Sequence, residues 1–367
     1  MKTLRTIRCK IRPRAEDLPV LARLFDLYSR ACTRIARYGR EHRQSNAVRL
    51  HHALYREIRS ELGLPANLVV TALRRAAGAL KAANFKGRFQ FRPSFVALDA
   101  RTFTLRLGKG EISFSTHLGH RLTAALLIGD YQHEALWGAE VAQSATLVRA
   151  RDGFYANVVV QSDVPESAQT GILGVDLGIR NIAVTSGSYR KPGIDLVNYR
   201  EHRRRIRASL QSKGTAGAKR ALKRLSGRER RHAAWVNHTV AKGIVGCALR
   251  ELCSLIRMED LQGIRARTKV PDKHRNRLQA HWSFGQLQGF VAYKAAAQGI
   301  RTELVPARNT SRTCRRCGRL GNRNRETFTC TPCGVILDAD QNAAHVIAAG
   351  GAAVNRPESK GLAHRVT

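Results

Sequence analysis

The chain has 367 residues and a formal net charge of +37, with 64 Lys and Arg against 27 Asp and Glu. This length allows two or three domains with their own cores, and such a charge excess indicates a polyanionic partner. No apolar run reaches the roughly 20 residues of a membrane span, and the even spread of charge favours nucleic acid over a membrane surface. Arginine outnumbers lysine 50 to 14, and its planar fork suits contacts to phosphate and guanine.

The N-terminus and the cysteines indicate a cytoplasmic protein. The first residues, MKTLR, alternate like a strand and lack the apolar core of a signal peptide. Four of the eight cysteines lie in two close pairs near the C-terminus, and the other four show no pairing pattern. A reducing compartment is therefore the simpler interpretation. The four cysteines outside the pairs are Cys9, Cys32, Cys247 and Cys253.

The N-terminal half changes its hydrophobic period twice. Residues 1–13 alternate between apolar and basic, which predicts a half-exposed strand. From about Glu16 the period is helical, and further helices are predicted at 51–62 and 65–83. Residues 87–165 return to short alternating runs between turn signals, which is typical of a small antiparallel barrel. The N-terminal strand is expected to complete this barrel, so the helical block would be an insertion.

From Gly171 onward the pattern predicts a mixed α/β region. The final residues, 351–367, have little to bury and are predicted to be disordered. The predicted strands are 172–176, 182–185, 195–197, 252–258 and 302–305, and the predicted helices are one ending near Arg250, 284–298 and 342–349.

A basic run occupies residues 201–230, with eleven Lys and Arg against two glutamates. A solvated helix face is the simpler alternative, but the shortage of acidic partners favours contact with phosphates. The residues expected to make these contacts are Arg203, Arg204, Arg205, Arg207, Lys213, Lys219, Arg220, Lys223 and Arg224.

The two C-terminal cysteine pairs follow the spacing C-x2-C-x12-C-x2-C, which is typical of a tetrahedral zinc site. A glycine follows each pair, Gly318 and Gly334, and permits the turn that aims backbone N–H groups at sulfur. We expect a structural zinc, because no histidine or open position is evident. The ligands would be Cys314, Cys317, Cys330 and Cys333, and neighbouring arginines, Arg315 and Arg316 among them, make the module a candidate nucleic-acid contact.

Three carboxylates from distant segments form the candidate catalytic site. Asp176 follows a short apolar strand and precedes Leu177-Gly178, which allows a tight exit. Glu259 ends the next buried strand, and Asp340 opens the C-terminal helix. Taken singly, they have simpler interpretations as a turn cap, a solvated strand end and a helix N-cap. Together, with the cysteine module between the second and third, they favour a metal site on an RNase H-like sheet.

Such a set is what a two-metal phosphodiesterase requires. Two Mg²⁺ or Mn²⁺ ions about 3.5–4 Å apart stabilise the attacking and leaving oxygens, and hard cations prefer oxygen ligands. In so basic a chain the three carboxylates form a local region of negative charge, and bound metal ions would make this region positive. Metal binding and nucleic-acid binding are therefore expected to be coupled. Between the two C-terminal aspartates, we expect Asp340 to be the ligand and Asp338 to lie on the strand leaving the cysteine module.

These motifs resemble those of the TnpB family, the RNA-guided nucleases of small transposons that are related to type V CRISPR effectors. The resemblance is detailed over roughly the C-terminal half and looser before it. Many members have arginine where this chain has Ala339. The matching segments are GVDLG at 174–178, EDL at 259–261, WSF at 282–284, YK at 293–294, NTSRTCRRCG at 309–318 and DQNAA at 340–344.

The resemblance implies an α+β multidomain fold. A wedge β-barrel would comprise residues 1–13 and 87–168, with a helical recognition lobe inserted at 14–86. A RuvC-type, RNase H-like nuclease domain would comprise residues 169–309 and 335–350, with a zinc ribbon inserted at 310–334.

The implied function is RNA-guided cutting of double-stranded DNA beside a short flanking motif. A guide RNA from the transposon end, one protein per RNA, and a prokaryotic, nucleoid-associated location are expected. Asp176, Glu259 and Asp340 match the family's catalytic triad, which would bind two Mg²⁺ or Mn²⁺ ions. A guided DNA-binding regulator that cuts weakly or not at all is the alternative, and a CRISPR-derived guide remains open. No tyrosine or added acidic motif argues for a transposase.

Overall fold

The computed structural model describes residues 2–138, 140–261 and 283–351. Its contacts divide the chain into two compact units, Lys2–Asp163 and a second unit that begins at Val164. In the part of the chain covered by these ranges, no helix is both long and apolar enough to cross a membrane. The tail predicted at 351–367 lies, apart from Gly351, outside the described residues.

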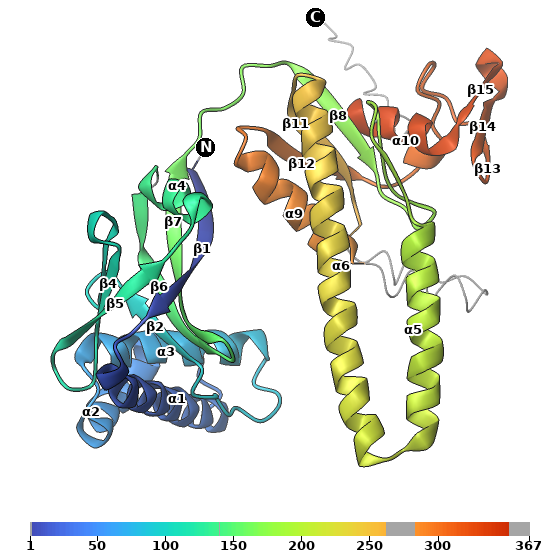
Figure 1. Ribbon diagram of the computed structural model, residues 1–367. Coiled ribbons are helices and arrows are strands. Elements are labelled where there is room, and N and C mark those ends of the chain that lie inside the picture. Colours follow the sequence, from blue (N-terminus) through green and yellow to red (C-terminus); the bar gives the residue numbers. More distant parts are fainter. Residues whose placement is uncertain (1, 139, 262–282, 352–367) are drawn as a thin grey trace, which may run out of the picture. The chain divides into compact units, whose positions relative to one another are not determined.

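The first unit is built on a seven-stranded antiparallel sheet with the order β2-β6-β7-β1-β5-β4-β3 (Figure 1). β1 (Lys2–Arg12) pairs with β7 (Gly153–Asp163) on one side and with β5 (Arg121–Leu127) on the other. The N-terminal strand thus pairs with the later strands, as predicted. Within the described residues the strands form a curled sheet with β2 and β3 as its two edge strands. The remaining strands are β2 (Phe95–Asp99), β3 (Phe103–Arg106), β4 (Glu111–Ser115) and β6 (Glu140–Ala150).

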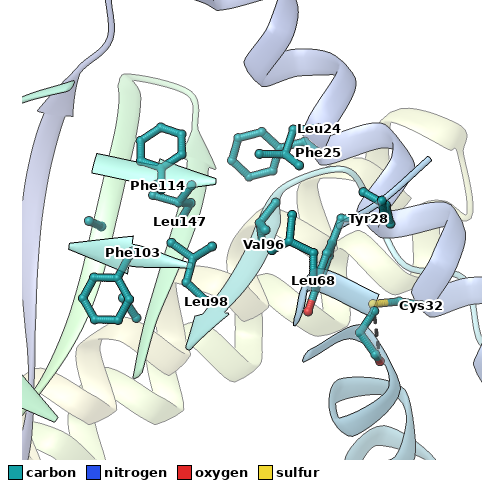
Figure 2. Close-up of a cluster of buried hydrophobic side chains, with 14 of the residues drawn as sticks. Leu24, Phe25, Tyr28, Cys32, Leu68, Val96, Leu98, Phe103, Phe114 and Leu147 are labelled. Carbon is teal, nitrogen blue, oxygen red and sulfur yellow. Dashed lines mark hydrogen bonds between the residues drawn. The ribbon is translucent and has the colours of Figure 1, made fainter. Parts of the chain in front are cut away.

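Three predicted helices follow β1 and share one core with the sheet. α2 begins after Asn46, whose side chain accepts two backbone N–H groups, and ends at Gly63 in the left-handed conformation. The helices are α1 (Leu18–Glu41), α2 (Ala47–Leu62), α3 (Ala66–Ala82) and, before β6, the short α4 (Asp130–Trp137). Figure 2 shows this core, to which α1 contributes Leu24, Phe25 and Tyr28, α3 contributes Leu68, and the strands contribute Val96, Leu98, Phe103, Phe114 and Leu147.

The second unit contains a five-stranded mixed sheet with the order β10-β9-β8-β11-β12. β8 and β9 form an antiparallel hairpin continued by β10, whereas β11 and β12 run parallel to β8. The strands are β8 (Gly171–Asp176), β9 (Asn181–Thr185), β10 (Arg190–Pro192), β11 (Cys253–Asp260) and β12 (Arg301–Pro306).

The strand predicted at 195–197 is wrong, because these residues belong to the first turn of α5. Pro192 ends the third strand, and Gly193 then donates its N–H to the Arg180 carbonyl at 2.7 Å. Asp195 lies in the first turn of the helix, where a negative charge interacts favourably with the helix dipole. A three-residue alternation is too short to distinguish a strand from a helix start.

The basic run lies in two long helices that pack against each other, α5 (Ile194–Lys213) and α6 (Ala216–Arg250) (Figure 1). The chain reverses at Gly214, which has φ of 63°, and Thr215 then caps α6 by accepting the Ala218 N–H. The other helices are α9 (Phe284–Ala296) and α10 (Ala339–Ala348).

Opposite faces of β8 contact different helices. Leu173 and Val175 are buried in a core with residues of α6 and α9, whereas the intervening Gly174 faces α10. A Cβ atom at Gly174 would lie 1.9 Å from the Ala344 carbonyl oxygen, so α10 can approach this closely only against glycine. Because side chains alternate along a strand, Asp176 faces the same side as Gly174. The packing of α10 therefore brings the start of this helix to the side of Asp176.

A small three-stranded sheet precedes α10; Cys330 ends its middle strand, Cys333 lies in the turn after it, and the first cysteine pair precedes the sheet. It consists of β13 (Asn322–Asn324), β14 (Thr327–Cys330) and β15 (Val335–Asp338). Short 3₁₀ helices occur at Ala15–Asp17, Leu107–Lys109, Thr310–Arg312 and Thr331–Cys333.

We expect Gly174→Ala to destabilise the second unit by about 1–3 kcal/mol, the usual range for overpacking a core. The added methyl group would push α10 away from β8, because it would collide with the Ala344 and Ala348 backbone. Urea denaturation measures the change. Gly285→Ala is the matched control, since a Cβ atom there meets nothing within 4 Å and alanine favours the helix. Equal stability of both variants and the wild type would contradict this packing argument.

Candidate active site and cysteine cluster

Register and packing bring the three predicted carboxylates to one face of the sheet. Met258 of β11 pairs with Val175 of β8, so Glu259 and Asp176 follow at neighbouring positions of parallel strands. Asp340 lies in the first turn of α10, which packs on β8 at Gly174. Three segments far apart in the sequence thus converge.

Each carboxylate has a defined surrounding. Asp340 accepts the Asn181 side-chain amide at 2.7 Å through one oxygen and the Arg323 guanidinium through the other. Glu259 accepts the Thr310 hydroxyl and is buried. Asp176 lies at the end of β8 and lines a pocket together with Asp340. These partners fix the orientation of two of the three carboxylates.

Burial and mutual repulsion disfavour ionisation of this cluster. Burial, followed by the charges of Glu259 and Asp340, raises the pKa of Asp176 well above its ordinary value. Burial also raises the pKa of Glu259, against the opposing effects of the Thr310 hydrogen bond and Arg323. Like charges that share a buried site repel one another in this way. A bound cation would relieve the repulsion and favour the ionised carboxylates.

The pocket at this site has a volume of about 1300 Å³. Its rim carries positive charge, which attracts phosphate, and one wall is apolar. The basic residues of the lining are Arg180, Arg312, Arg323 and Arg325, and the wall includes Ile194, Val197 and Phe284. Acidic, basic and apolar side chains therefore line one cavity.

Asp338 has a structural role, as expected from its position at the end of β15. It is the N-cap of α10, where its side chain accepts the Gln341 N–H at 2.8 Å, and it pairs with Arg190 at 2.9 Å. Although burial opposes the effect, these two contacts hold the pKa of Asp338 below its ordinary value. The simpler interpretation of Asp340 as the N-cap is thus wrong, and its side chain is available to the pocket.

The four predicted cysteines form one cluster whose sulfur atoms all lie within 4.8 Å of one another. Cys314 and Cys333 sulfurs are 3.6 Å apart, and Cys317 and Cys330 sulfurs are 3.5 Å apart. Tetrahedral zinc with bonds of about 2.3 Å would separate sulfurs by about 3.8 Å, so the cluster fits this ion. Among the described residues, the three carboxylates do not form a comparably tight group, but their oxygen donors suit Mg²⁺ or Mn²⁺.

Backbone geometry prepares the cysteine cluster for a metal. Gly318 and Gly334 have φ of 72° and 69°, as the sequence predicts for the turns after each pair. Against the effect of burial, backbone N–H groups of Cys317 and Arg316 lower the pKa of Cys314 to about 7. The thiolate of Cys314, which is the form that binds zinc, is therefore accessible near neutral pH, whereas burial raises the pKa of Cys330 and Cys333.

The cysteine module is tied directly to α10 and thereby to Asp340. The Asn342 side chain donates to the Thr313 carbonyl at 2.7 Å and accepts the Arg315 N–H at 3.0 Å. Ala339 is fully buried in the same small core as Phe328. The guanidinium beside Asp340 comes from Arg323 of β13 and not from position 339. A change in this module would consequently alter the carboxylate site.

The predicted phosphate contacts lie on α5, on α6 and in the first cysteine turn, but several have partners within the chain. Both glutamates of the basic run form ion pairs with its arginines, so acidic partners are few but not absent. Glu201 pairs with Arg204 and Arg205, and Glu229 pairs with Arg207. Arg203 lies over the Tyr199 ring at 5.0 Å. The exposed members of the set are Arg204, Arg205, Lys213, Lys219, Arg220, Lys223, Arg224, Arg315 and Arg316.

Sequence reasoning missed three residues that hold the carboxylates. Asn181, Thr310 and Arg323 contact Asp340 or Glu259 from other segments. Thr310 and Arg323 lie near the cysteine pairs, but nothing in their spacing indicates a carboxylate partner. Only the folded register shows these contacts.

Comparison with known proteins identifies similar sequences. A family model described as Cas12f1-like, TNB domain, matches residues 284–347. The CRISPR-associated endodeoxyribonuclease Cas12f1 of Sulfoacidibacillus thermotolerans is 31% identical over 197 residues, covering 48% of this chain and 45% of that protein. A TnpB-like protein of Methanocaldococcus jannaschii is 31% identical over 144 residues, covering 39% of this chain and 51% of that protein. The chain thus spans about half the length of these relatives.

A comparison with solved structures also gives a match. It is a cryo-EM structure of a Cas12f1–sgRNA–target DNA complex, which matches with a TM-score of 0.41 and 16% identity. The match covers 94% of this chain and 98% of that one.

We expect Asp176→Asn to raise the Tm in buffer without added divalent cations at pH 8. The raised pKa values of Asp176 and Glu259 mean that the folded state holds more protons than the unfolded state above about pH 4. Stability from these groups is therefore present at low pH and is lost as pH rises through their folded-state pKa values. The Tm gain should be roughly 2–4 °C for each 1 kcal/mol relieved.

Calorimetry at two pH values tests this expectation. The difference between Asp176→Asn and wild type should shrink toward pH 4, and added Mn²⁺ should stabilise the wild type more than the variant. Asp338→Asn is the control, since asparagine can still cap α10 but loses the charge that pairs with Arg190, so its Tm should not rise. A lower Tm for Asp176→Asn at pH 8 would contradict the repulsion.

Proposed function

We propose, from the premise that the chain belongs to the TnpB/Cas12f-type family, that it is an RNA-guided DNA endonuclease. The observation that carries the proposal is the convergence of Asp176, Glu259 and Asp340 on one face of the β8–β11 sheet. The name of the Cas12f1 relative, an endodeoxyribonuclease, supports DNA as the substrate. The charge of +37 supports a large polyanionic partner such as a guide RNA.

We infer a RuvC-type, RNase H-like nuclease domain in residues 169–309 and 335–350, with a zinc ribbon at 310–334. The β8–β9 hairpin with a carboxylate at the end of its first strand supports this assignment. The first unit would supply the wedge sheet, from residues 1–13 and 87–168, and a recognition lobe at 14–86. A transposon-derived guide and one protein per RNA remain part of the proposal.

In the proposed reaction, the chain positions a phosphodiester beside the three carboxylates. Two Mg²⁺ or Mn²⁺ ions held by Asp176, Glu259 and Asp340 would supply activation of water and stabilisation of the leaving oxygen. Asn181 orients Asp340, Thr310 orients Glu259, and the arginine rim attracts the phosphate. The apolar wall of the pocket would accept an unstacked base next to the scissile bond.

The test of this function is guided cutting by the purified ribonucleoprotein. RNA that copurifies with the chain is sequenced, and DNA matched to its guide region is supplied with Mg²⁺. Asp340→Asn should lose cutting by more than the roughly 10–100-fold typical of losing an outer-shell partner, while guided DNA binding persists. Asp338→Asn, the matched control, should keep cutting because Asp338 caps α10.

Three results would count against the proposal. Sequence-specific cutting by RNA-free protein would indicate a conventional nuclease. Guided binding without cutting by the wild type would favour the DNA-binding regulator. Loss of cutting in Asp338→Asn but not in Asp340→Asn would reverse the ligand assignment.

We also propose that the cysteine cluster binds one structural zinc ion. Cys330→Ser should reduce the zinc content measured by mass spectrometry from one ion per chain toward none and should loosen the ribbon, because a tetrathiolate site needs all four ligands. Cys253→Ser removes a thiol outside the cluster and should leave the zinc content unchanged. Folded wild-type protein without zinc would refute the site.

A further inference from the structure

Arg323 makes a contact with Asp340 that the proposed reaction does not use. It lies on β13, and its guanidinium donates to one oxygen of Asp340 while Asn181 donates to the other. The Asp340 side chain is 12% exposed, and these two contacts occupy one acceptor position on each of its oxygens. A metal ion at the oxygen that faces Arg323 would therefore compete with the guanidinium for that oxygen.

The charge of Arg323 acts on the whole carboxylate cluster. In opposition to burial, it lowers the pKa of Asp176 and of Glu259. Two other arginines at this edge have different partners, Arg180 with Glu326 and Arg190 with Asp338. Within the described residues, Arg323 is thus the arginine whose ion pair is with a member of the proposed triad.

We propose that Arg323 is a resident counter-ion of the carboxylate cluster, which a divalent cation displaces from Asp340 and which then binds a nucleic-acid phosphate in the same pocket. The inference rests on the proposed function, because it assumes that the triad binds metal. Arg323 and the cation would compete for one carboxylate. Phosphate offers Arg323 another charge-assisted partner and so removes the competition.

The local geometry permits this exchange. The Arg323 side chain is 30% exposed and lines the pocket, so it can turn toward a ligand without unfolding β13. The ion pairs Arg180–Glu326 and Arg190–Asp338 hold the β13–β14 turn and the start of α10 independently of Arg323. The movement required is therefore that of one side chain.

Linkage gives the exchange a measurable consequence. If nucleic acid removes the competition for Asp340, it must strengthen metal binding, and metal must strengthen nucleic-acid binding by the same factor. A purely structural ion pair has the opposite signature. Its loss would misplace Asp340 and weaken metal binding.

The experiment measures Mn²⁺ binding to the RNA-free full-length chain by calorimetry at pH 8. Arg323→Gln should bind Mn²⁺ at least about fivefold more tightly than wild type, at the lower end of typical coupling between sites. Arg325→Gln is the matched control, since Arg325 lines the same pocket and loses the same charge. Its Mn²⁺ affinity should stay within about twofold of wild type.

A second titration adds a single-stranded DNA oligonucleotide at saturating concentration. It should tighten Mn²⁺ binding to the wild type and to Arg325→Gln, but much less to Arg323→Gln, in which the competitor is already absent. Equal or weaker Mn²⁺ binding by Arg323→Gln than by wild type would overturn the counter-ion proposal. An equal gain in Mn²⁺ affinity over the wild type in Arg323→Gln and Arg325→Gln would show a general charge effect. This result would overturn the counter-ion proposal as well.

Asp176→Asn separates this proposal from the proposed function. A Mn²⁺ site that disappears in Asp176→Asn but is unchanged in Arg323→Gln refutes the counter-ion role and leaves the metal site intact. If Asp176→Asn binds Mn²⁺ like the wild type, the triad is not the metal site, and both proposals fail.

Discussion

The contact between α10 and β8 at Gly174 is the constraint on which the candidate site depends. A helix can lie this close to a strand only where the strand has no side chain, and the distances at Ala344 and Ala348 leave no room for one. This contact sets the position of Asp340 relative to Asp176. Asn342 then connects the same helix to the cysteine module. A shift of the module would therefore move α10 and, with it, Asp340.

Electrostatics at this site oppose the folded state but suit the proposed function. The chain carries an excess of positive charge, yet it buries Asp176, whose pKa is raised by this burial and by the charges of Glu259 and Asp340. Such a cluster lowers the free energy of unfolding unless a cation lies beside it. Functional sites commonly lower stability in this way. Arg323 supplies such a charge within the chain, and metal ions would replace it at Asp340.

The sequence predicted elements with a strong pattern and missed contacts that depend on tertiary structure. The strands leading to Asp176 and Glu259, the helix after Asp338 and the convergence of the cysteines were all evident, because period and spacing encode them. The strand predicted at 195–197 failed because three alternating residues carry too little information. Arg323, Asn181 and Thr310 could not be assigned, since their partners are up to 159 residues away. The pairing of Glu229 with Arg207 likewise required the α5–α6 hairpin, whereas Glu201 pairs with arginines of its own helix.

The most direct test of the central claim is electron paramagnetic resonance of Mn²⁺ bound to the wild-type ribonucleoprotein with a matched DNA that resists cleavage. Two ions held by one set of carboxylates about 3.5–4 Å apart would be magnetically coupled. The account predicts the spectrum of a coupled Mn²⁺ pair that appears as the second ion binds. A spectrum of isolated Mn²⁺ ions at saturation would contradict a two-metal site at Asp176, Glu259 and Asp340.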